Sequence, residues 1–175
     1  MIDEVELEQL VAEGDVRLLI VEGRHIWEAS PSPAHQMIVD DIRASIRPAE
    51  KRGSGGGCGC YHLADTNLTL TPRRRKHSQV RPDIAIYCER PPRQQTALRI
   101  VPAAVIEIVS PRYEEKDLET LPPAYLHAGV LDVLVYDPQT QAITWFDQQG
   151  GVEEPQHLTA PQTITLHYGC QVTIA

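Results

Sequence analysis

The alternation of hydrophobic and polar residues predicts a hairpin followed by a helix. Residues 17–21 and 25–29 are short extended runs around a turn that contains Gly23. Ser32 can act as the N-cap of the helix, and Pro33 fits its first turn. Four hydrophobic residues recur every four positions and predict the side of this helix that faces the core: Ala34, Ile38, Ile42 and Ile46.

Further strands are expected around a second helix. Residues 58–64 and 67–71 predict a strand pair, and buried strands are expected around Asp83 and Glu107. The second helix should begin at Ser110-Pro111, break near Leu121 because two prolines follow, and restart through Tyr125 to end at Gly129. Later strands are expected at residues 131–136, 142–147, 163–166 and 171–174, the last two adding to a sheet edge.

The order of these elements predicts one domain over residues 1–175 with a mixed central sheet flanked by helices. The strand, helix and strand between residues 103 and 136 form a βαβ-type unit, whereas the amino-terminal hairpins are antiparallel. The fold class is therefore α/β, or α+β under a stricter definition. Exposed terminal strands also leave a homodimer open, because uncovered sheet edges tend to pair.

Composition and charge narrow the function classes. A net charge of −8 argues against generic binding to a polyanion, although it does not exclude a nuclease with local phosphate contacts. The basic run Arg73, Arg74, Arg75 and Lys76 either contacts nucleic acid or is a solvated loop. We expect a cytoplasmic protein, because the chain starts with an acidic segment and contains no membrane-spanning run. The glycine-rich stretch at residues 50–57 lacks a phosphate-binding pattern.

The four cysteines are expected to be reduced thiols. Cys58 and Cys60 form the only close pair, and their spacing is Cys-x-Cys, which fits neither a secreted disulfide scaffold nor a zinc ribbon. A zinc site with His62 is conceivable, but two alternate residues of one strand explain the pair more simply. Cys88 and Cys170 stand apart from it in the sequence.

Asp83 and Glu107 are the strongest candidates for chemistry. Each lies in a hydrophobic, strand-like run, and a buried carboxylate persists only if it is paired, hydrogen-bonded or bound to a cation. Asp83 also follows a proline, so a solvated aspartate at the start of a strand remains an alternative. Glu107 lies between Ile106 and Ile108 and needs a partner. Two such acids on neighbouring strands indicate a site for a divalent metal.

These residues belong to an ordered set of motifs that resembles the Uma family of restriction endonucleases, a branch of the PD-(D/E)xK nuclease superfamily. The set spans residues 22–138 and consists of Glu22-Gly23, Ser30-Pro31-Ser32-Pro33 with His35, Arg81-Pro82-Asp83, Glu107-Ile-Val-Ser110-Pro111, Asp117, Tyr125-Leu-His-Ala-Gly-Val130 and Asp137-Pro138.

The resemblance implies a restriction-endonuclease-like fold. It also implies an enzyme that hydrolyses DNA and depends on magnesium or manganese. The metal would be held by Asp83, Glu107 and the main-chain oxygen of Ile108, and it would activate water for attack on a phosphodiester. His35 is either a core or capping residue or a ligand. Asp117 and Tyr125 also match the pattern, although they could simply orient the second helix.

The sequence departs from the family pattern at two positions. The family lysine is expected four residues after Asp117, where this chain has Leu121, and a family acid is expected where it has Leu19. Lys116 is the nearest substitute, but a regular α-helix would direct it about 140° away from Leu121. The chain is therefore expected to be a magnesium-dependent DNA endonuclease. Its catalysis would be impaired if Lys116 does not replace the family lysine. The alternative is a binding or regulatory protein on a degenerate nuclease scaffold.

Overall fold

The structure is a computed structural model of the 175-residue chain. It describes residues 9–10, 13–14, 16–49, 57–94, 96–111 and 113–175. The acidic start of the chain and residues 50–56 of the glycine-rich stretch lie outside these ranges, so the predictions made for them stay predictions. Within the described ranges, no helix is both long enough and apolar enough to span a membrane.

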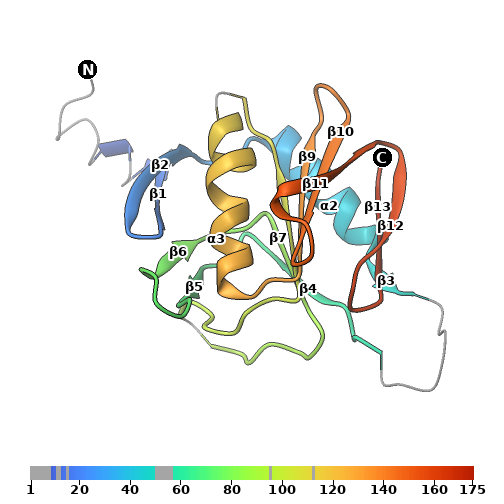
Figure 1. Cartoon of the computed structure of the whole chain (residues 1–175). Coiled ribbons are helices and arrows are strands. Elements are labelled where there is room, and N and C mark those ends of the chain that lie inside the picture. The colour runs from blue at the N-terminus through green and yellow to red at the C-terminus, as the bar shows by residue number, and fades with distance from the viewer. Residues whose placement is uncertain (1–8, 11–12, 15, 50–56, 95, 112) are drawn as a thin grey trace.

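A six-stranded mixed sheet forms the centre of the fold (Figure 1). Its spatial order is β11-β10-β9-β8-β7-β4, and only β8 and β9 pair in parallel. The strands are β4 (Tyr61–Ala64), β7 (Ile84–Tyr87), β8 (Ala104–Ile108), β9 (Asp132–Asp137), β10 (Ala142–Asp147) and β11 (Gly151–Thr159). The predicted mixed sheet and βαβ unit are confirmed.

A second sheet with the order β2-β1-β6-β5 contains the predicted amino-terminal hairpin. Its strands are β1 (Val16–Val21), β2 (Arg24–Ala29), β5 (Leu68–Leu70) and β6 (Ser78–Val80). The predicted pairing of residues 58–64 with 67–71 is wrong, because β4 pairs with β7 and β5 pairs with β6. Since β7 is fully buried, both of its edges need hydrogen-bonding partners, and β4 and β8 supply them.

A third sheet has the order β12-β13-β3, with β3 (Arg47–Pro48), β12 (Gln162–Thr165) and β13 (Cys170–Ile174). The last two predicted strands therefore form a sheet of their own and do not extend the central one. The edge next to β10 is instead β11. Its mostly exposed sequence carries little of the hydrophobic signal by which a strand is recognised.

Helix α2 (Pro33–Ser45) begins as predicted, since the side chain of Ser32 accepts a hydrogen bond from the His35 N–H. Val39 and Ile42 are its buried residues, whereas Ala34 is exposed. The expected core-facing side was therefore wrong at its first position, because the helix packs on the core only from its second turn onward.

The second helix consists of a π-helical segment, η1 (Lys116–Thr120), followed directly by α3 (Leu121–Ala128). It ends at Gly129, whose φ of 99° is left-handed, as expected for a helix-terminating glycine. The predicted break near Leu121 is wrong. The helix continues through Pro122 and Pro123 because both lie in the first turn of α3, where a missing N–H costs little.

Two hydrophobic clusters lie on opposite faces of the central sheet, with α3 covering one face and α2 the other (Figure 1). Ile106 and Ile108 pack in the cluster that contains α2, whereas Val105 and Val109 pack in the cluster that contains α3. Because side chains alternate along a strand, Glu107 shares the face of Val105. The acid therefore points toward the second helix.

The prediction of reduced cysteines is wrong for this structure, which joins Cys58 to Cys88 and Cys60 to Cys170 by disulfides. Cys58 and Cys60 precede β4, so alternation along a strand does not explain their spacing. His62 directs its Nδ1 at the carbonyl oxygen of Cys60, 3.1 Å away. The partners of the Cys-x-Cys pair come from distant parts of the chain, which local spacing could not reveal.

Candidate active site

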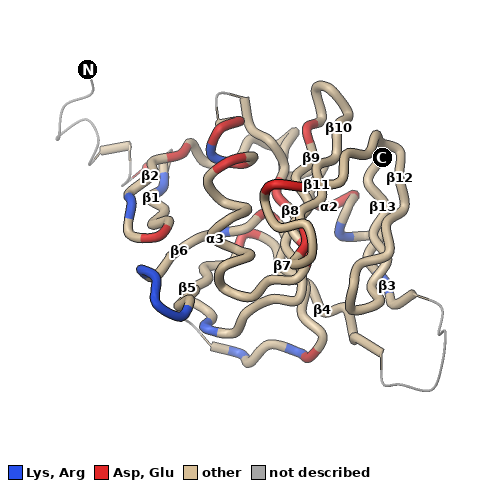
Figure 2. The backbone as a smooth tube through the Cα atoms, in the orientation of Figure 1, with Lys and Arg blue, Asp and Glu red and all other residues tan. Residues whose placement is uncertain are grey.

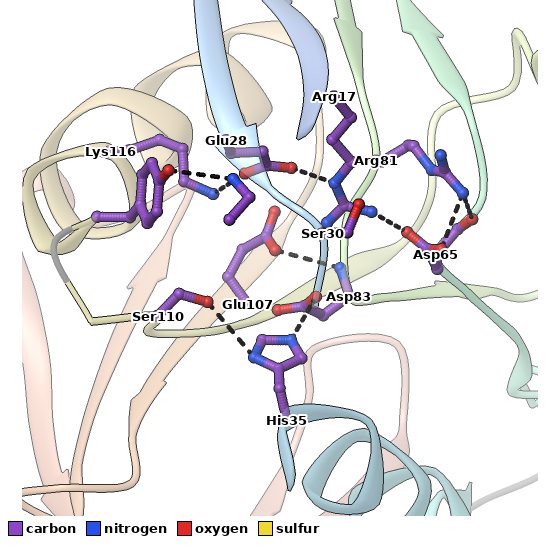
Figure 3. Close-up of polar contacts among 12 residues, drawn as sticks. Arg17, Glu28, Ser30, His35, Asp65, Arg81, Asp83, Glu107, Ser110 and Lys116 are labelled. Carbon is purple, nitrogen blue, oxygen red and sulfur yellow. Dashed lines mark hydrogen bonds and ion pairs between the residues drawn. The ribbon is translucent and has the colours of Figure 1, made fainter. Parts of the chain in front are cut away.

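Asp83 and Glu107 lie side by side at the ends of adjacent strands (Figure 3). The N–H of Asp83 donates to Oε2 of Glu107 at 3.2 Å, and the N–H of Ile108 donates to Oδ2 of Asp83 at 2.8 Å. Each carboxylate therefore receives a backbone hydrogen bond from the strand that carries the other. Their exposed fractions are 6% and 4%, so both are held in a buried setting.

Two further side chains fix the outer oxygens of this pair. Tyr125, which is fully buried in α3, donates its hydroxyl to Oε1 of Glu107 at 2.6 Å. Nε2 of His35 lies 2.8 Å from Oδ1 of Asp83, and Nδ1 of the same ring lies 3.5 Å from Oγ of Ser110. His35 therefore contacts one of the acids directly, and Tyr125 contacts the other. Neither residue serves only to cap or orient its helix.

Lys116 enters the same site from η1. Its Nζ lies 2.5 Å from Oε2 of Glu28 and 2.7 Å from Oδ1 of Asp117, and the lysine is mostly buried. Oδ2 of Asp117 accepts a hydrogen bond from the N–H of Ser110. Asp117 thus connects the lysine to the end of the strand that carries Glu107.

The π-helical geometry explains why Lys116 reaches the site. The assumption of a regular α-helix is wrong here, since the N–H of Leu121 donates to the carbonyl of Lys116, five residues earlier. Residues joined by such a bond lie one turn apart on the same side of the helix. Lys116 and Leu121 accordingly line one cavity together with Asp83 and Glu107.

Arg17 and Glu28 are site residues that were not predicted from the sequence, and they face each other across the β1–β2 hairpin. Nε of Arg17 lies 2.6 Å from Oε1 of Glu28, whose other oxygen binds Lys116. Leu19 lies on the same face of β1 as Arg17, which Glu28 contacts. Glu28 therefore supplies an acid on the face of the hairpin where the family pattern expects one and Leu19 has no charge. In the sequence, the only sign of this role was that Glu28 is a charged residue within a predicted strand of alternating hydrophobic and polar residues.

A second set of ion pairs continues from this network. Asp65 contacts Arg17 and also lies 2.8 Å from Arg81, which precedes Asp83 by two residues (Figure 3). The arginine side of the site is thereby fixed to the segment that carries the first acid. The cavity lined by Arg17 and Arg81 together with the two acids has a volume of about 20 Å³, enough for about one water-sized occupant.

The buried charges perturb one another. Burial, followed by the charge of Asp83, raises the pKa of Glu107 well above its ordinary value. Burial also raises the pKa of Asp117 to about 6, although Lys116 acts in the opposite direction. Burial disfavours the charged ring of His35, but the hydrogen bond to Asp83 and the negative charges of Asp83 and Asp117 together outweigh this effect and raise the pKa of His35.

Burial also disfavours charged Lys116, but the surrounding carboxylates, led by Asp117, raise its pKa. The lysine therefore remains a cation throughout the neutral range. Perturbed pKa values of this kind are concentrated at functional sites, which marks these residues as a candidate active site.

The donor set fits a hard divalent cation. Magnesium is usually bound by one or two carboxylates together with water and substrate oxygens, and each carboxylate oxygen keeps a second lone pair beside its present hydrogen bond. A cation would also relieve the repulsion that helps raise the pKa of Glu107. Within the described part of the chain, three or more ligand atoms of His, Cys, Asp or Glu converge only at the cysteines, so this site supplies two acids.

The basic run lies apart from this cavity. Arg73, Arg74, Arg75 and Lys76 form the exposed turn between β5 and β6, visible as the longest blue segment in Figure 2. Arg75 lies 3.4 Å from Glu22 at the tip of the β1–β2 hairpin. None of the four residues lines the cavity, so any role in binding a polyanion would be exerted at a distance from the acids.

Comparisons with known proteins identify the fold and the family of the chain. The chain is similar over 84% of its length to a crystal structure described as a putative nuclease belonging to DUF820 from Anabaena variabilis, with a TM-score of 0.58, 19% sequence identity and 79% of that chain covered. At this identity the match establishes a shared fold. No curated protein matches the chain. The sequence pattern of Uma2, described as "putative restriction endonuclease", matches residues 5–175, and the chain therefore belongs to the Uma2 family.

Proposed function

We propose that the protein is a magnesium- or manganese-dependent endonuclease with a restriction-endonuclease-like fold that hydrolyses DNA phosphodiester bonds. One observation carries this proposal: Lys116 shares a cavity with Asp83 and Glu107 although the family lysine position is occupied by Leu121. The family membership supports a nucleic-acid substrate. With a cation restored beside the two acids, the proposal of an active enzyme is favoured over that of a degenerate scaffold.

The metal would be held by Asp83, Glu107 and the main-chain oxygen of Ile108. When bound, such a metal supplies Lewis-acid polarisation of the phosphoryl group and a more acidic water. Tyr125 and His35 keep the two carboxylates in place through the hydrogen bonds at 2.6 and 2.8 Å. Such support from a second layer of residues typically matters about 10–100-fold for metal affinity.

Lys116 would stabilise the negative charge that develops on the phosphoryl oxygens, because its Nζ is cationic and mostly buried. Preorganised charges are most effective in such water-poor sites. Its ion pairs with Glu28 and Asp117 hold the side chain in position until a substrate phosphate competes for it. The Arg73 to Lys76 turn would attract the DNA backbone by long-range electrostatics, which is expected to weaken as salt increases.

Cleavage of supercoiled plasmid in the presence of Mg²⁺ or Mn²⁺ tests the proposal. The wild type should nick DNA only with the cation, and Asp83→Asn and Glu107→Gln should each remove the activity. Glu153→Gln makes the same chemical change as Glu107→Gln at an exposed position on β11 and should cleave like the wild type. Cleavage that survives both active-site changes, or that persists in excess chelator, would refute the assignment.

A folded protein that binds Mn²⁺ but cleaves neither DNA nor RNA would refute the proposed catalysis and support the binding or regulatory alternative. Binding can be measured separately, from the relaxation enhancement that bound Mn²⁺ produces in water. The metal site and the reaction are thereby tested by independent observations.

A further inference from the structure

All four cysteines of the chain gather at one point, and none of them lines the cavity that contains Asp83 and Glu107. The sulfur atoms of Cys58, Cys60 and Cys170 lie within 4.8 Å of one another. The sulfur of Cys88 is bonded to that of Cys58 and therefore belongs to the same cluster. We call these residues the four-sulfur cluster.

Three separate segments build the four-sulfur cluster. Cys58 and Cys60 precede β4, Cys88 follows β7, and Cys170 begins β13. The pairs are separated by 30 and 110 residues in the sequence. The cluster therefore connects the β12-β13-β3 sheet to the segments that flank β4 and β7 of the central sheet.

The backbone around the Cys-x-Cys pair is shaped for this convergence. The N–H of Gly59 donates to the carbonyl of Cys88 at 2.9 Å, and a Cβ on Gly59 would come within 2.6 Å of the Tyr61 ring and 2.9 Å of that carbonyl. Cys60 adopts a left-handed φ of 51°, which is uncommon for a residue other than glycine. The two sulfurs thus reach the same point through a tight turn.

We propose that the reduced protein binds one Zn²⁺ through the thiolates of Cys58, Cys60, Cys88 and Cys170. Zinc prefers four thiolate ligands at about 2.3 Å in a tetrahedron, which places the sulfurs about 3.8 Å apart. The sulfurs of Cys58, Cys60 and Cys170 already lie within 4.8 Å of one another, and those joined in a disulfide would move apart to this spacing after reduction. Cys58, Cys60 and Cys170 are buried, as in a structural site, and the partly exposed Cys88 gives the ion a route of entry.

The disulfide-bonded and zinc-bound forms are two states of the same cluster. Reduction of the two disulfides takes four electrons and four protons, which two molecules of a dithiol reductant supply while each becomes a disulfide. Binding of Zn²⁺ by the four resulting thiols then releases four protons. In either state the cluster holds β13 against the segments that flank β4 and β7, so the fold keeps a link between its sheets in reducing and oxidising surroundings.

Reduced wild-type protein provides the first test. The chain is treated with a phosphine reductant without air, transferred to buffer with stoichiometric Zn²⁺ and weighed intact under native conditions. We expect one zinc ion per chain and protection of all four thiols from iodoacetamide. A reduced, folded chain that binds no zinc, or whose four thiols are alkylated equally fast with and without zinc, would overturn the proposal.

Ligand identity is tested with Co²⁺ and with two matched variants. Co²⁺ should give the intense visible absorption of a tetrahedral site together with thiolate charge-transfer bands. Cys170→Ser should weaken zinc binding at least about a hundredfold, since even outer residues of metal sites contribute 10–100-fold. His62→Gln, which changes the neighbouring potential ligand, should leave the affinity unchanged. Loss of binding in His62→Gln with retention in Cys170→Ser would contradict the four-sulfur assignment.

The experiment on wild-type thiols remains decisive if Cys170→Ser fails to fold, because it needs no substitution. It is also independent of the proposed nuclease activity, since Mg²⁺ at the two acids does not protect cysteines from alkylation.

Discussion

The backbone N–H of Leu121 donates a hydrogen bond to the carbonyl of Lys116, five residues earlier. This single π-helical bond places the two side chains on the same side of the helix, so that a lysine at position 116 and a residue at position 121 face the same cavity. We infer that Lys116 takes the role that the family pattern assigns to position 121. Glu28 is inferred in the same way to supply the acid that Leu19 does not.

Removing the charge of Lys116 should destabilise the fold. Lys116→Met leaves the buried Asp117 without its cation and leaves Glu28 with Arg17 alone, and breaking a buried ion pair typically costs about 3–5 kcal/mol. The Glu28→Gln/Lys116→Met double variant removes both charges of one pair and should recover part of that loss. Urea denaturation of the wild type, the two single variants and the double variant measures the coupling. Equal stability of Lys116→Met and the wild type would contradict the buried pairing.

Tyr125→Phe should destabilise the protein by about 1–3 kcal/mol, the usual cost of leaving a buried acceptor without its donor. The hydroxyl that is lost donates to Oε1 of Glu107 at 2.6 Å, and both residues are buried. The same substitution at Tyr168, which is 51% exposed, provides the control and should have little effect. A loss as large in Tyr168→Phe would show that the effect does not arise from the Glu107 contact.

Metal affinity should increase with pH. Because burial and the charge of Asp83 raise the pKa of Glu107, this acid keeps its proton to higher pH in the metal-free protein and must release it when the cation binds. Calorimetry in two buffers of different ionisation enthalpy should detect that proton. Tyr125→Phe removes a hydrogen bond that lowers the same pKa, so its affinity profile should shift to higher pH. An affinity independent of pH would contradict this coupling.

The positions of the two acids could be predicted from the sequence because they depend on local patterns. Asp83 and Glu107 each belong to a strand with a clear hydrophobic signal, and neighbouring buried strands bring such residues together. The start of α2 could be predicted equally well, because the N-cap Ser32 and Pro33 both act within the first turn of the helix. These features need no knowledge of distant contacts.

The remaining features depend on contacts that local patterns do not encode. Pro122 and Pro123 signalled a disturbed helix, but the choice between a break and a π-helical segment depends on the buried partners of Lys116. Glu28 belongs to the site only because the β1–β2 hairpin packs near η1, where Glu28 contacts Lys116. The cysteines likewise pair across 30 and 110 residues, and β11 is mostly exposed.

A further pH effect on stability should arise away from the active site, at His167. Its Nδ1 lies 2.7 Å from Oδ1 of the buried Asp132, and this hydrogen bond raises the pKa of the histidine above 6.5. The resulting stability is fully present below pH 6.5 and is lost as the pH rises through the raised value. His167→Gln should flatten this part of the profile, whereas His157→Gln, at an exposed position on β11, should preserve it. The measurement is the denaturation midpoint at a series of pH values from about 5.5 to 8.5, a range that covers the titration of histidine.

Lys116 is proposed here as the catalytic cation that the family pattern places at position 121. Single-turnover cleavage of plasmid DNA tests it directly in the wild type, Lys116→Met and Lys116→Met/Leu121→Lys, with folding and Mn²⁺ binding checked for each. Lys116→Met should bind Mn²⁺ but cleave about 100- to 1,000-fold more slowly, as when one preorganised charge is removed, and the second lysine should restore part of the rate. A folded Lys116→Met protein that cleaves DNA as fast as the wild type would contradict a catalytic role for Lys116.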